Sequence, residues 1–578
     1  MKIAGNDILI QSLINEGVEY IFGYPGGAAL HIYDSIFNQK EMQHILVRHE
    51  QGATHAADGY ARATGKPGVV LVTSGPGATN AITGIATAFM DSIPMVVISG
   101  QVQSHLIGTD AFQETDMIGV SRPIVKHSFT VDKQENIAQI VKEAFHIATS
   151  GRQGPVVIDV PKDLTNPDEL FDFNYPEKAN IRSYNPPVKP ENHQVSRAVD
   201  AILNAERPVI YAGGGTISSN ASDELRELNE LIDFPVTNTL MGLGVYPGTG
   251  KRFLGMLGMH GTYQANMAMH NADVIIAIGA RFDDRITNTP SMFAPNAKIV
   301  HVDVDPASIS KIINADIPIV GQVKESLAAL IKEIKRSKIK IDSEALDNWN
   351  LQISKWREKH GLDHDLYLSK IKSAMIAPQV VVQELYHATQ GNAFVTSDVG
   401  QHQMFVAQYY HFNKPRRWIN SGGLGTMGFG LPAAMGVKLA FPKHEVVCVT
   451  GEGSIQMCIQ ELSTCLQYNL PIKIININNE ALGMVRQWQD MNYGGRHSAS
   501  TYSDSLPDFV KLAESYGHIG MKVTKQSQLK KTLEKAFSMK DRLVFIDVYV
   551  DPNEHVYPML VAPNGSMKDM WITKNTKA

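Results

Sequence analysis

The sequence predicts an α/β protein with three doubly wound domains, each built on a parallel sheet with helices on both faces. Short apolar stretches alternate with helical stretches along most of the chain, as in parallel sheets whose strands are connected by helices. The chain has 578 residues, which is enough for several domains. Two segments, 166–192 with its five prolines and 336–374 after a charged stretch, interrupt this alternation and are expected to be linkers.

The first domain is expected at 1–165. Its first helix is predicted at 6–16 because apolar residues recur there at helical spacing, and a short strand follows at 20–23. An apolar strand at 69–73 runs into Ser74-Gly75-Pro76-Gly77, and another strand is expected at 95–99 after Ile93-Pro94. This alternation of strands and helices indicates a parallel sheet.

The second domain is expected at 193–335. A strand at 209–212 runs into Gly213-Gly214-Gly215, and a strand at 274–278 runs into Gly279. A later strand at 299–304 contains Asp303 near its end. Glycines and an acid at strand ends suit a dinucleotide, although the full glycine fingerprint is absent from the sequence.

The third domain is expected at 375–550, and a C-terminal tail follows at 551–578. Its strand at 447–450 runs into Gly451-Glu452-Gly453-Ser454, and the strand at 474–477 ends in Asn478-Asn479. The carboxyl ends of parallel strands meet at one edge of a sheet, where α/β folds bind ligands. A carboxylate and an amide beside a helix N-terminus suit Mg²⁺ bound to a diphosphate. The alternative is an ordinary turn with an acid that caps the helix.

The first and third domains resemble each other in their order of elements. In both, an apolar strand runs into a glycine turn, a helix follows, and a proline precedes the next strand. Only the third domain has the acid and the paired asparagines. One domain binding the diphosphate end of a cofactor and the other its ring end would explain this difference, although strand–helix units in general look alike.

Glu50 is a second candidate for a functional acid. It follows the apolar stretch 45–47 and begins a helix rich in small residues, including Ala53, Ala56 and Ala57. Close packing would bury the carboxyl group and raise its pKa. The alternative is a residue that caps the first turn of the helix.

Composition restricts the class of protein. Hydrophobic residues make up 43% and charged residues 19%, as in globular proteins, and the net charge of −5 gives no support for nucleic-acid binding. No apolar run approaches the roughly 18 residues of a membrane span, and the N-terminus lacks a signal-peptide pattern. Cys448, Cys458 and Cys465 have no metal-ligand spacing, so buried free thiols and a cytoplasmic location are expected.

The glycine–acid–glycine and paired asparagine motifs resemble the signature of thiamine diphosphate-dependent enzymes, with Glu452 in place of the usual aspartate. Further motifs extend the resemblance over nearly the whole chain. Together they are similar to the catalytic large subunits of biosynthetic acetohydroxyacid synthases, also called acetolactate synthases. These further motifs lie at 23–27, 108–114, 160–163, 257–262, 281–285, 422–430 and 482–488.

The resemblance implies a pyrimidine-binding first domain, a Rossmann-like FAD-binding second domain and a diphosphate-binding third domain. It implies thiamine diphosphate, Mg²⁺ and FAD as cofactors, a homodimer or higher oligomer with active sites between its chains, and a small regulatory subunit as partner. The implied reaction decarboxylates pyruvate and joins its hydroxyethyl unit to pyruvate or 2-ketobutyrate, in the biosynthesis of valine, leucine and isoleucine. A pyruvate oxidase, a catabolic acetolactate synthase and a non-catalytic flavin-binding homologue are the alternatives.

The resemblance also implies roles for individual residues. Glu50 would hydrogen-bond the pyrimidine ring, and Mg²⁺ would be held by Glu452, Asn479 and Ala481. Arg285 would bind the carboxylate of the second keto acid, and Trp488 would shape the pocket for its alkyl group. Apart from the resemblance, an arginine such as Arg285 is more often part of a surface ion pair, and a tryptophan such as Trp488 more often part of a helix core.

Three further sets of residues follow from the resemblance. The reaction centre would be lined by Gly27, Phe112, Gln113 and Lys162, of which Lys162 otherwise suits a solvated position. Thiamine diphosphate would contact Pro76, Asn80, Val399, Gly400, Gln401, His402, Gly425, Met427, Gly453, Ser454, Met484 and Val485. FAD would contact Arg152, Gly213, Gly214, Gly215, Leu257, Gly258, Met259, His260, Gly261, Thr262, Gly279, Arg281, Asp283, Arg285 and Asp303.

Overall fold

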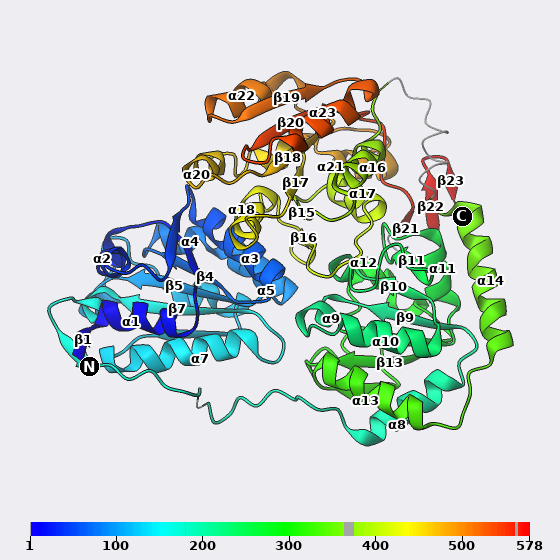
Figure 1. Ribbon diagram of the computed structural model, residues 1–578, viewed down its shortest axis with the longest axis horizontal. Coiled ribbons are helices and arrows are strands. Elements are labelled where there is room, and N and C mark those ends of the chain that lie inside the picture. Colours follow the sequence, from blue (N-terminus) through cyan, green and yellow to red (C-terminus); the bar gives the residue numbers. More distant parts are fainter. Residues whose placement is uncertain (1, 180, 363–374, 561–564, 578) are drawn as a thin grey trace.

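Three α/β domains, each with a six-stranded parallel sheet, make up the molecule in the computed structural model (Figure 1). The structure describes residues 2–179, 181–362, 375–560 and 565–577. The N-terminal domain is blue to cyan in Figure 1, the central domain green, and the C-terminal domain yellow to orange. The expected fold class is therefore confirmed.

The N-terminal domain has the strand order β3-β2-β4-β5-β7-β6. Every residue of β4 and β5 is buried, because helices cover both faces of the sheet. Its strands are β2 (Tyr20–Gly23), β3 (Gln43–Leu46), β4 (Gly68–Val72), β5 (Met95–Gln101), β6 (His127–Thr130) and β7 (Pro155–Pro161), with a separate antiparallel pair β1 (Lys2–Ala4) and β8 (Leu170–Asp172). Its helices are α1 (Gly5–Asn15), α2 (Leu30–Phe37), α3 (Glu50–Thr64), α4 (Pro76–Asn80), α5 (Ile82–Asp91), α6 (Met117–Ser121) and α7 (Ile137–Thr149).

The central domain has the order β11-β10-β9-β12-β13-β14. Across the sheet the strand numbers fall as far as β9 and rise from β12, so the order of connection switches between these two parallel strands. Ligands of such sheets bind in the crevice at this switch point. The strands are β9 (Pro208–Ala212), β10 (Val236–Asn238), β11 (Phe253–Met256), β12 (Val274–Ile278), β13 (Lys298–Asp303) and β14 (Ile317–Val320). The helices are α8 (Asn192–Leu203), α9 (Gly214–Ser218), α10 (Ser222–Ile232), α11 (Tyr263–Asn271), α12 (Asp284–Thr287) and α13 (Val323–Arg336).

The C-terminal domain repeats the topology of the N-terminal domain, with the order β16-β15-β17-β18-β20-β19. The likeness of the two outer domains noted in the sequence thus extends to every strand. The strands are β15 (Phe394–Ser397), β16 (Trp418–Asn420), β17 (Val446–Thr450), β18 (Lys473–Asn478), β19 (Ile519–Val523) and β20 (Val544–Tyr549). The helices are α16 (Pro378–Thr389), α17 (Gln401–Tyr409), α18 (Gly430–Ala440), α19 (Glu452–Ile455), α20 (Glu461–Gln467), α21 (Gly483–Asn492), α22 (Phe509–Ser515) and α23 (Gln526–Ser538).

Two segments are more ordered than the sequence indicated. Within the segment 336–374, expected to be a linker, lies helix α14 (Ser343–His360), and its Leu346, Trp349 and Ile353 are buried in the core of the central domain. These apolar residues occupy one stripe of an otherwise charged helix, which explains why composition suggested a linker. Residues 363–374 of this segment lie outside the described residues.

The C-terminal tail forms a small antiparallel sheet of β21 (Met559–Leu560), β22 (Met570–Thr573) and β23 (Thr576–Lys577) beside the central domain (Figure 1). Leu560, Met567 and Met570 are buried in the central core. The tail therefore joins the C-terminal domain to the central one.

Close contact between α3 and α18 joins the two outer domains. A Cβ atom at Gly59 would lie 2.3 Å from the Ala433 carbonyl oxygen, and one at Gly436 would lie 1.9 Å from that of Ala56. Only glycine permits the backbones to approach this closely. The small residues near Glu50 thus serve a contact between domains.

Two expectations from composition can be compared with the described residues. All three cysteines are buried free thiols, as expected. Among the helices that the structure describes, none is both long and apolar enough to cross a membrane.

Candidate active site

Glu452, Asn479 and Ala481 lie together at the carboxyl edge of the C-terminal sheet. Glu452 begins α19 directly after β17, and Asn479 directly follows the neighbouring parallel strand β18. The Ala481 N–H donates to Glu452 Oε1 at 2.7 Å and to Asn479 Oδ1 at 3.2 Å. One backbone amide thus brings the two side-chain oxygens together.

The surroundings of Glu452 fit a divalent cation. The residue is 1% exposed, and burial raises the pKa of its carboxyl group to about 8, although backbone hydrogen bonds act in the opposite direction. Within the described part of the chain, the nearby Tyr502 hydroxyl is buried without a hydrogen-bond partner. A buried carboxylate with an amide oxygen beside it forms a set of hard oxygen donors that suits Mg²⁺.

Glycines make room for the His402 ring beside this acid. A Cβ atom at Gly400 would lie 2.8 Å from the His402 ring, and one at Gly451 would lie 2.9 Å from it. Burial lowers the pKa of His402 to about 4, and its Nε2 has no partner among the described residues. The free N–H groups that begin α17, together with a neutral imidazole, are suitable donors for a diphosphate.

Ser454 and Gln401, also expected near the diphosphate, have side chains that hydrogen-bond other groups of the protein. The Ser454 hydroxyl donates to the Val399 carbonyl at 3.3 Å. The side-chain amide of Gln401 is engaged by the protein, because it accepts from Asn479 at 3.1 Å and donates to Gln487 at 2.8 Å. Its backbone N–H, in the first turn of α17, is the group available to a ligand.

Glu50 lies in the first turn of α3 and is 9% exposed. His49, not Glu50, caps the helix, because its Nδ1 accepts from the Gln51 N–H at 3.1 Å. The Asn80 amide donates to Glu50 Oε2 at 3.0 Å, and a Cβ atom at Gly77 would lie 3.3 Å from Oε1. Glu50 and Asn80 therefore form one group at the edge of the N-terminal sheet, near Pro76, which begins α4.

Other expected residues of the reaction centre also lie near this edge. A Cβ atom at Gly75 would lie 2.8 Å from the Gln113 carbonyl oxygen. A Cβ atom at Gly27 would meet no described atom within 4 Å, and Phe112 is 89% exposed. Lys162 begins a short 3₁₀ turn (Lys162–Thr165) directly after β7.

A cavity of about 700 Å³ extends between the three domains. The residues expected to contact FAD that line it are Arg152, Gly213, Gly214, Gly215, Leu257, Met259, His260, Gly279, Arg281, Asp283, Arg285 and Asp303. The lining residues expected around thiamine diphosphate are Val399, Gly400, Gly425, Met427, Met484 and Val485. The structure thus brings twelve of the fifteen residues expected around FAD, and six of the twelve expected around thiamine diphosphate, into one space.

The glycine loops of the central domain open into this cavity. A Cβ atom at Gly213 would lie 2.3 Å from the Gly279 carbonyl oxygen, so the loops after β9 and β12 touch at the switch point. Burial raises the pKa of Asp303, at the end of β13, to about 6. A narrow glycine crevice with an acid at a strand end fits a dinucleotide such as FAD.

Gly258, Gly261 and Thr262, also expected to contact FAD, shape the neighbouring loop. Gly258 has a φ of +103°, and a Cβ atom there would lie 2.6 Å from the Arg285 carbonyl oxygen. Thr262 caps α11 by accepting from the Ala265 N–H at 3.3 Å. These residues act through the backbone path that carries Met259 and His260.

Arg285 and Trp488 both line the cavity. The Arg285 side chain is 65% exposed, and its Nε lies 3.8 Å from Asp284 Oδ2, a long distance for an ion pair. Trp488 is half-buried on α21. Arg285 therefore has the exposed ion-pair contact considered as its alternative, and it lines the cavity together with Trp488.

Sequence reasoning missed an interdomain cluster at Arg62 and Asp91. Arg62 pairs with Asp58 and, at 2.9 Å, with Asp91. Asp91 also accepts from the N–H groups of Gly422 and Gly423 in the C-terminal domain. The spacing of Asp58 and Arg62 on one helix face was an available signal for part of this cluster.

The two candidate acids, Glu452 and Glu50, lie in separate clusters within the single chain. Glu452, Asn479 and Ala481 are one cluster, and Glu50 and Asn80 are the other. No hydrogen bond or ion pair in the described part of the chain joins the two.

Comparison with known families matches three successive parts of the chain. Residues 3–120 match the thiamine pyrophosphate enzyme N-terminal TPP binding domain, 195–330 the central domain, and 398–548 the C-terminal TPP binding domain. The fold and these matches define a thiamine pyrophosphate enzyme. Thiamine diphosphate is therefore confirmed as a cofactor.

Curated relatives narrow the class. An acetolactate synthase large subunit from Buchnera aphidicola of Schizaphis graminum is 60% identical over 574 residues, 99% of each chain. The acetolactate synthase isozyme 3 large subunit of Escherichia coli is 55% identical, covering 100% of this chain and 99% of the relative. An acetolactate synthase from Mycobacterium bovis is 45% identical, covering 97% and 90%. The chain belongs to the family of acetolactate synthase large subunits, and the alternative activities are not favoured.

Proposed function

We propose that the protein decarboxylates pyruvate and joins the remaining two-carbon unit to a second pyruvate or to 2-ketobutyrate, as the first common step toward valine, leucine and isoleucine. The observation that carries this proposal is the shared cavity. In it, Gly425 and Met427, expected to contact thiamine diphosphate, lie in one space with Arg285 and Trp488, expected at the second substrate. Bound thiamine diphosphate would supply an acidic ring carbon that adds to a keto group and a cationic ring that takes up the electron pair released with CO₂.

Glu50 holds a proton for this chemistry in the proposed mechanism. Its carboxyl group, oriented by Asn80, hydrogen-bonds a ring nitrogen of the cofactor and thereby favours deprotonation of the reactive carbon. Gly77 leaves space beside it, because a Cβ atom there would lie 3.3 Å from Glu50 Oε1. The exposed Phe112 excludes water once a second chain covers this edge.

The side chains of Glu452 and Asn479 and the backbone carbonyl of Ala481 hold Mg²⁺ in this proposal. The hard oxygen donors and the buried position of Glu452 support it. Glu452 retains the charge and ligand type of the usual aspartate and adds one methylene. Its contact with the Ala481 N–H sets where the carboxylate lies.

Arg285 binds the carboxylate of the acceptor keto acid, and Trp488 contacts its alkyl group. A guanidinium can bind a carboxylate through two hydrogen bonds. The long distance to Asp284 leaves Arg285 available for this task. FAD occupies the crevice between the loops after β9 and β12.

We place the active site between two chains of a homodimer, because Glu50 and Glu452 form separate clusters within one chain. A small regulatory subunit is the expected partner, since relatives of this chain are named large subunits. Three buried free thiols support a cytoplasmic location.

A pyruvate assay with the purified protein, thiamine diphosphate, Mg²⁺ and FAD tests the proposal. Acetolactate should form, and 2-ketobutyrate should divert the product to 2-aceto-2-hydroxybutyrate. Oxygen consumption with acetate as product would contradict the proposal in favour of an oxidase.

A further inference from the structure

A row of hydrogen-bonded amide side chains leads from Asn479 into the protein interior. Asn479 Nδ2 donates to Gln401 Oε1 at 3.1 Å, and Gln401 Nε2 donates to Gln487 Oε1 at 2.8 Å. Gln401 is 5% exposed and Gln487 is fully buried. Each amide has a donor end and an acceptor end, so the orientation of one determines that of the next.

The backbone of Val556 fixes the orientation of Gln487, the amide farthest from Asn479 in this row. The Val556 N–H donates to Gln487 Oε1 at 2.9 Å, and Gln487 Nε2 donates to the Val556 carbonyl at 3.0 Å. A backbone N–H only donates and a carbonyl only accepts, so this pair permits one orientation of Gln487. Val556 is buried, and Gln408 donates to the next carbonyl, that of Tyr557, at 3.3 Å.

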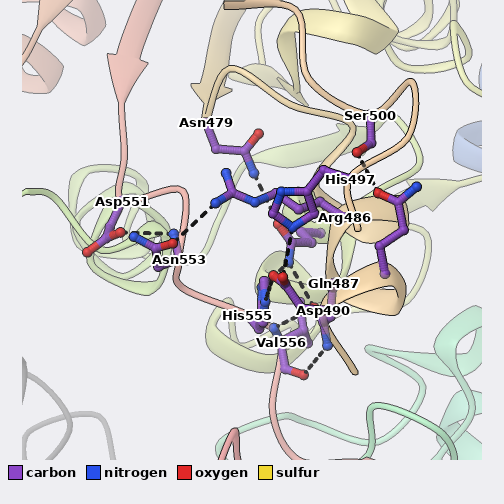
Figure 2. Close-up of polar contacts among 12 residues, drawn as sticks. Asn479, Arg486, Gln487, Asp490, His497, Ser500, Asp551, Asn553, His555 and Val556 are labelled. Carbon is purple, nitrogen blue, oxygen red and sulfur yellow. Dashed lines mark hydrogen bonds and ion pairs between the residues drawn. The ribbon is translucent and has the colours of Figure 1, made fainter. Parts of the chain in front are cut away.

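His555 fixes the middle amide independently. Its Nε2 lies 2.8 Å from Asp490 Oδ2, and the other Asp490 oxygen lies 2.7 Å from His497 Nε2 (Figure 2). Burial lowers the pKa of His555, which favours the neutral form of its ring. A neutral ring with its proton toward Asp490 has an acceptor at Nδ1, which lies 3.3 Å from Gln401 Nε2. Both N–H groups of Gln401 thus have determined acceptors.

We propose that Gln487 and Gln401 are positioning residues that turn the oxygen of Asn479 toward the metal ion. The inference rests on the proposed function, in which Asn479 binds Mg²⁺. With Nδ2 committed to Gln401, the Asn479 oxygen faces the other way, where it shares the Ala481 N–H with Glu452. A reversed amide would present its electropositive NH₂ group to the cation and could not bind it.

This chain of hydrogen bonds from Val556 through Gln487 and Gln401 to Asn479, here called the relay, makes the metal site depend on the C-terminal segment. Val556 belongs to the stretch that continues into β21, where the Leu560 N–H donates to the Met259 carbonyl at 2.8 Å. Met259 lines the cavity beside the proposed FAD crevice. Docking of this segment onto the central domain therefore also orients a ligand of the metal.

The first test replaces Gln487 by methionine, which keeps the length of the side chain and removes both polar ends. Mg²⁺ is titrated into the full-length protein at saturating thiamine diphosphate, with tryptophan fluorescence as the readout. We expect the Kd for Mg²⁺ to rise about tenfold to a hundredfold, as for other residues that orient metal ligands. Gln401→Met should give a loss of similar size. A Kd within about twofold of the parent value in both variants would overturn the relay.

Asn553→Ala is the matched control. Asn553 also connects the C-terminal segment to α21, because it accepts from Arg486 at 3.2 Å, but it is outside the row of amides. Its replacement should leave the Kd for Mg²⁺ within about twofold of the parent. An equal loss of Mg²⁺ affinity in this variant would indicate that Mg²⁺ binding depends only on docking of the C-terminal segment. That result would overturn the role of amide orientation.

A test in the Asn479→Asp background separates orientation from packing. Both terminal atoms of an aspartate are acceptors, so the metal ligand no longer needs orienting. Gln401 must then reverse to donate to the aspartate, which conflicts with the orientation that Gln487 imposes. Adding Gln487→Met should leave Mg²⁺ binding unchanged or tighter in this background. A loss as large as in the parent would overturn the relay.

The proposed function and the relay fail in different ways. If the parent protein shows no Mg²⁺-dependent binding of thiamine diphosphate, the proposed function fails, and the relay fails with it. If the parent binds Mg²⁺ and Gln487→Met binds it equally well, only the relay fails. Ligand-free thermal unfolding of each variant measures its fold separately from the titration.

Discussion

Arg62 and Asp91 form a buried ion pair at 2.9 Å, with side chains that are 5% and 2% exposed. The same Asp91 carboxylate accepts from the N–H groups of Gly422 at 3.0 Å and Gly423 at 2.7 Å. The N-terminal domain thus holds the C-terminal loop that leads to Gly425. The position of the loop at the proposed thiamine ring is consequently set by another domain.

Asp91→Ala should destabilise the protein by about 3–5 kcal/mol, because it leaves part of the buried Arg62 charge uncompensated. Urea unfolding followed by circular dichroism measures this change. Asp223→Ala removes an exposed partner of Arg226, whose pair is 3.0 Å long, and should cost about 0–1 kcal/mol. Equal losses in the two variants would contradict the role assigned to Asp91.

Glu50→Gln should lower kcat by about a hundredfold to ten-thousandfold, because the amide cannot give the proton that a carboxylic acid supplies. Acetolactate formation measures the rate, and a thermal shift shows whether thiamine diphosphate still binds. Glu19→Gln, at an exposed ion pair with Lys66, should retain the parent rate.

Glu452→Gln should abolish the thermal stabilisation that Mg²⁺ with thiamine diphosphate provides, because it removes the charged metal ligand. Glu452→Asp should retain Mg²⁺ binding with lower affinity. The shorter side chain draws its oxygen away from the Ala481 N–H, which now lies 2.7 Å from it. Tighter binding in the aspartate variant would show that the extra methylene is not accommodated by this loop.

Arg285→Gln should lower kcat/KM for carboligation by about tenfold to a hundredfold, the equivalent of ~1.5–3 kcal/mol for a hydrogen bond to a charged group. Release of CO₂ from the first pyruvate in a single turnover should be unchanged, since Arg285 binds only the acceptor. Parallel measurement of CO₂ and acetolactate separates the two steps. A loss confined to CO₂ release would refute this assignment.

Asp159→Asn should remove a pH dependence of stability. Burial raises the pKa of Asp159 to about 7, against an ordinary value of 3.8. The folded state therefore binds more protons than the unfolded state between these values, and stability falls as pH rises through this window. In the Asp159→Asn variant this contribution should vanish, and unfolding free energies measured between the two pKa values test it. A parent slope of the opposite sign would contradict the assignment.

Sequence patterns located the strand-end residues well, because these depend on local order along the chain. Glu452 and Asn479 follow two neighbouring parallel strands, and the topology then places them together. Patterns located α14 poorly, because its three buried residues stand in an otherwise charged helix. Their burial depends on the surface of the central domain that they cover. Gln487 and Asp91 gave no usable signal, since their partners lie far away in the chain.

By itself, the sequence determined the three-domain α/β class, the likeness of the outer domains and the edges where acids and glycines would gather. These properties follow from the periodicity of apolar residues and from the turns that end each strand. Only the tertiary structure decided that Asp91 holds the Gly422–Gly423 backbone, that the tail packs on the central domain, and that Val556 orients three amides in series. Hydrogen bonds depend on distance and direction in space, and these are set when domains pack, not by separation along the chain.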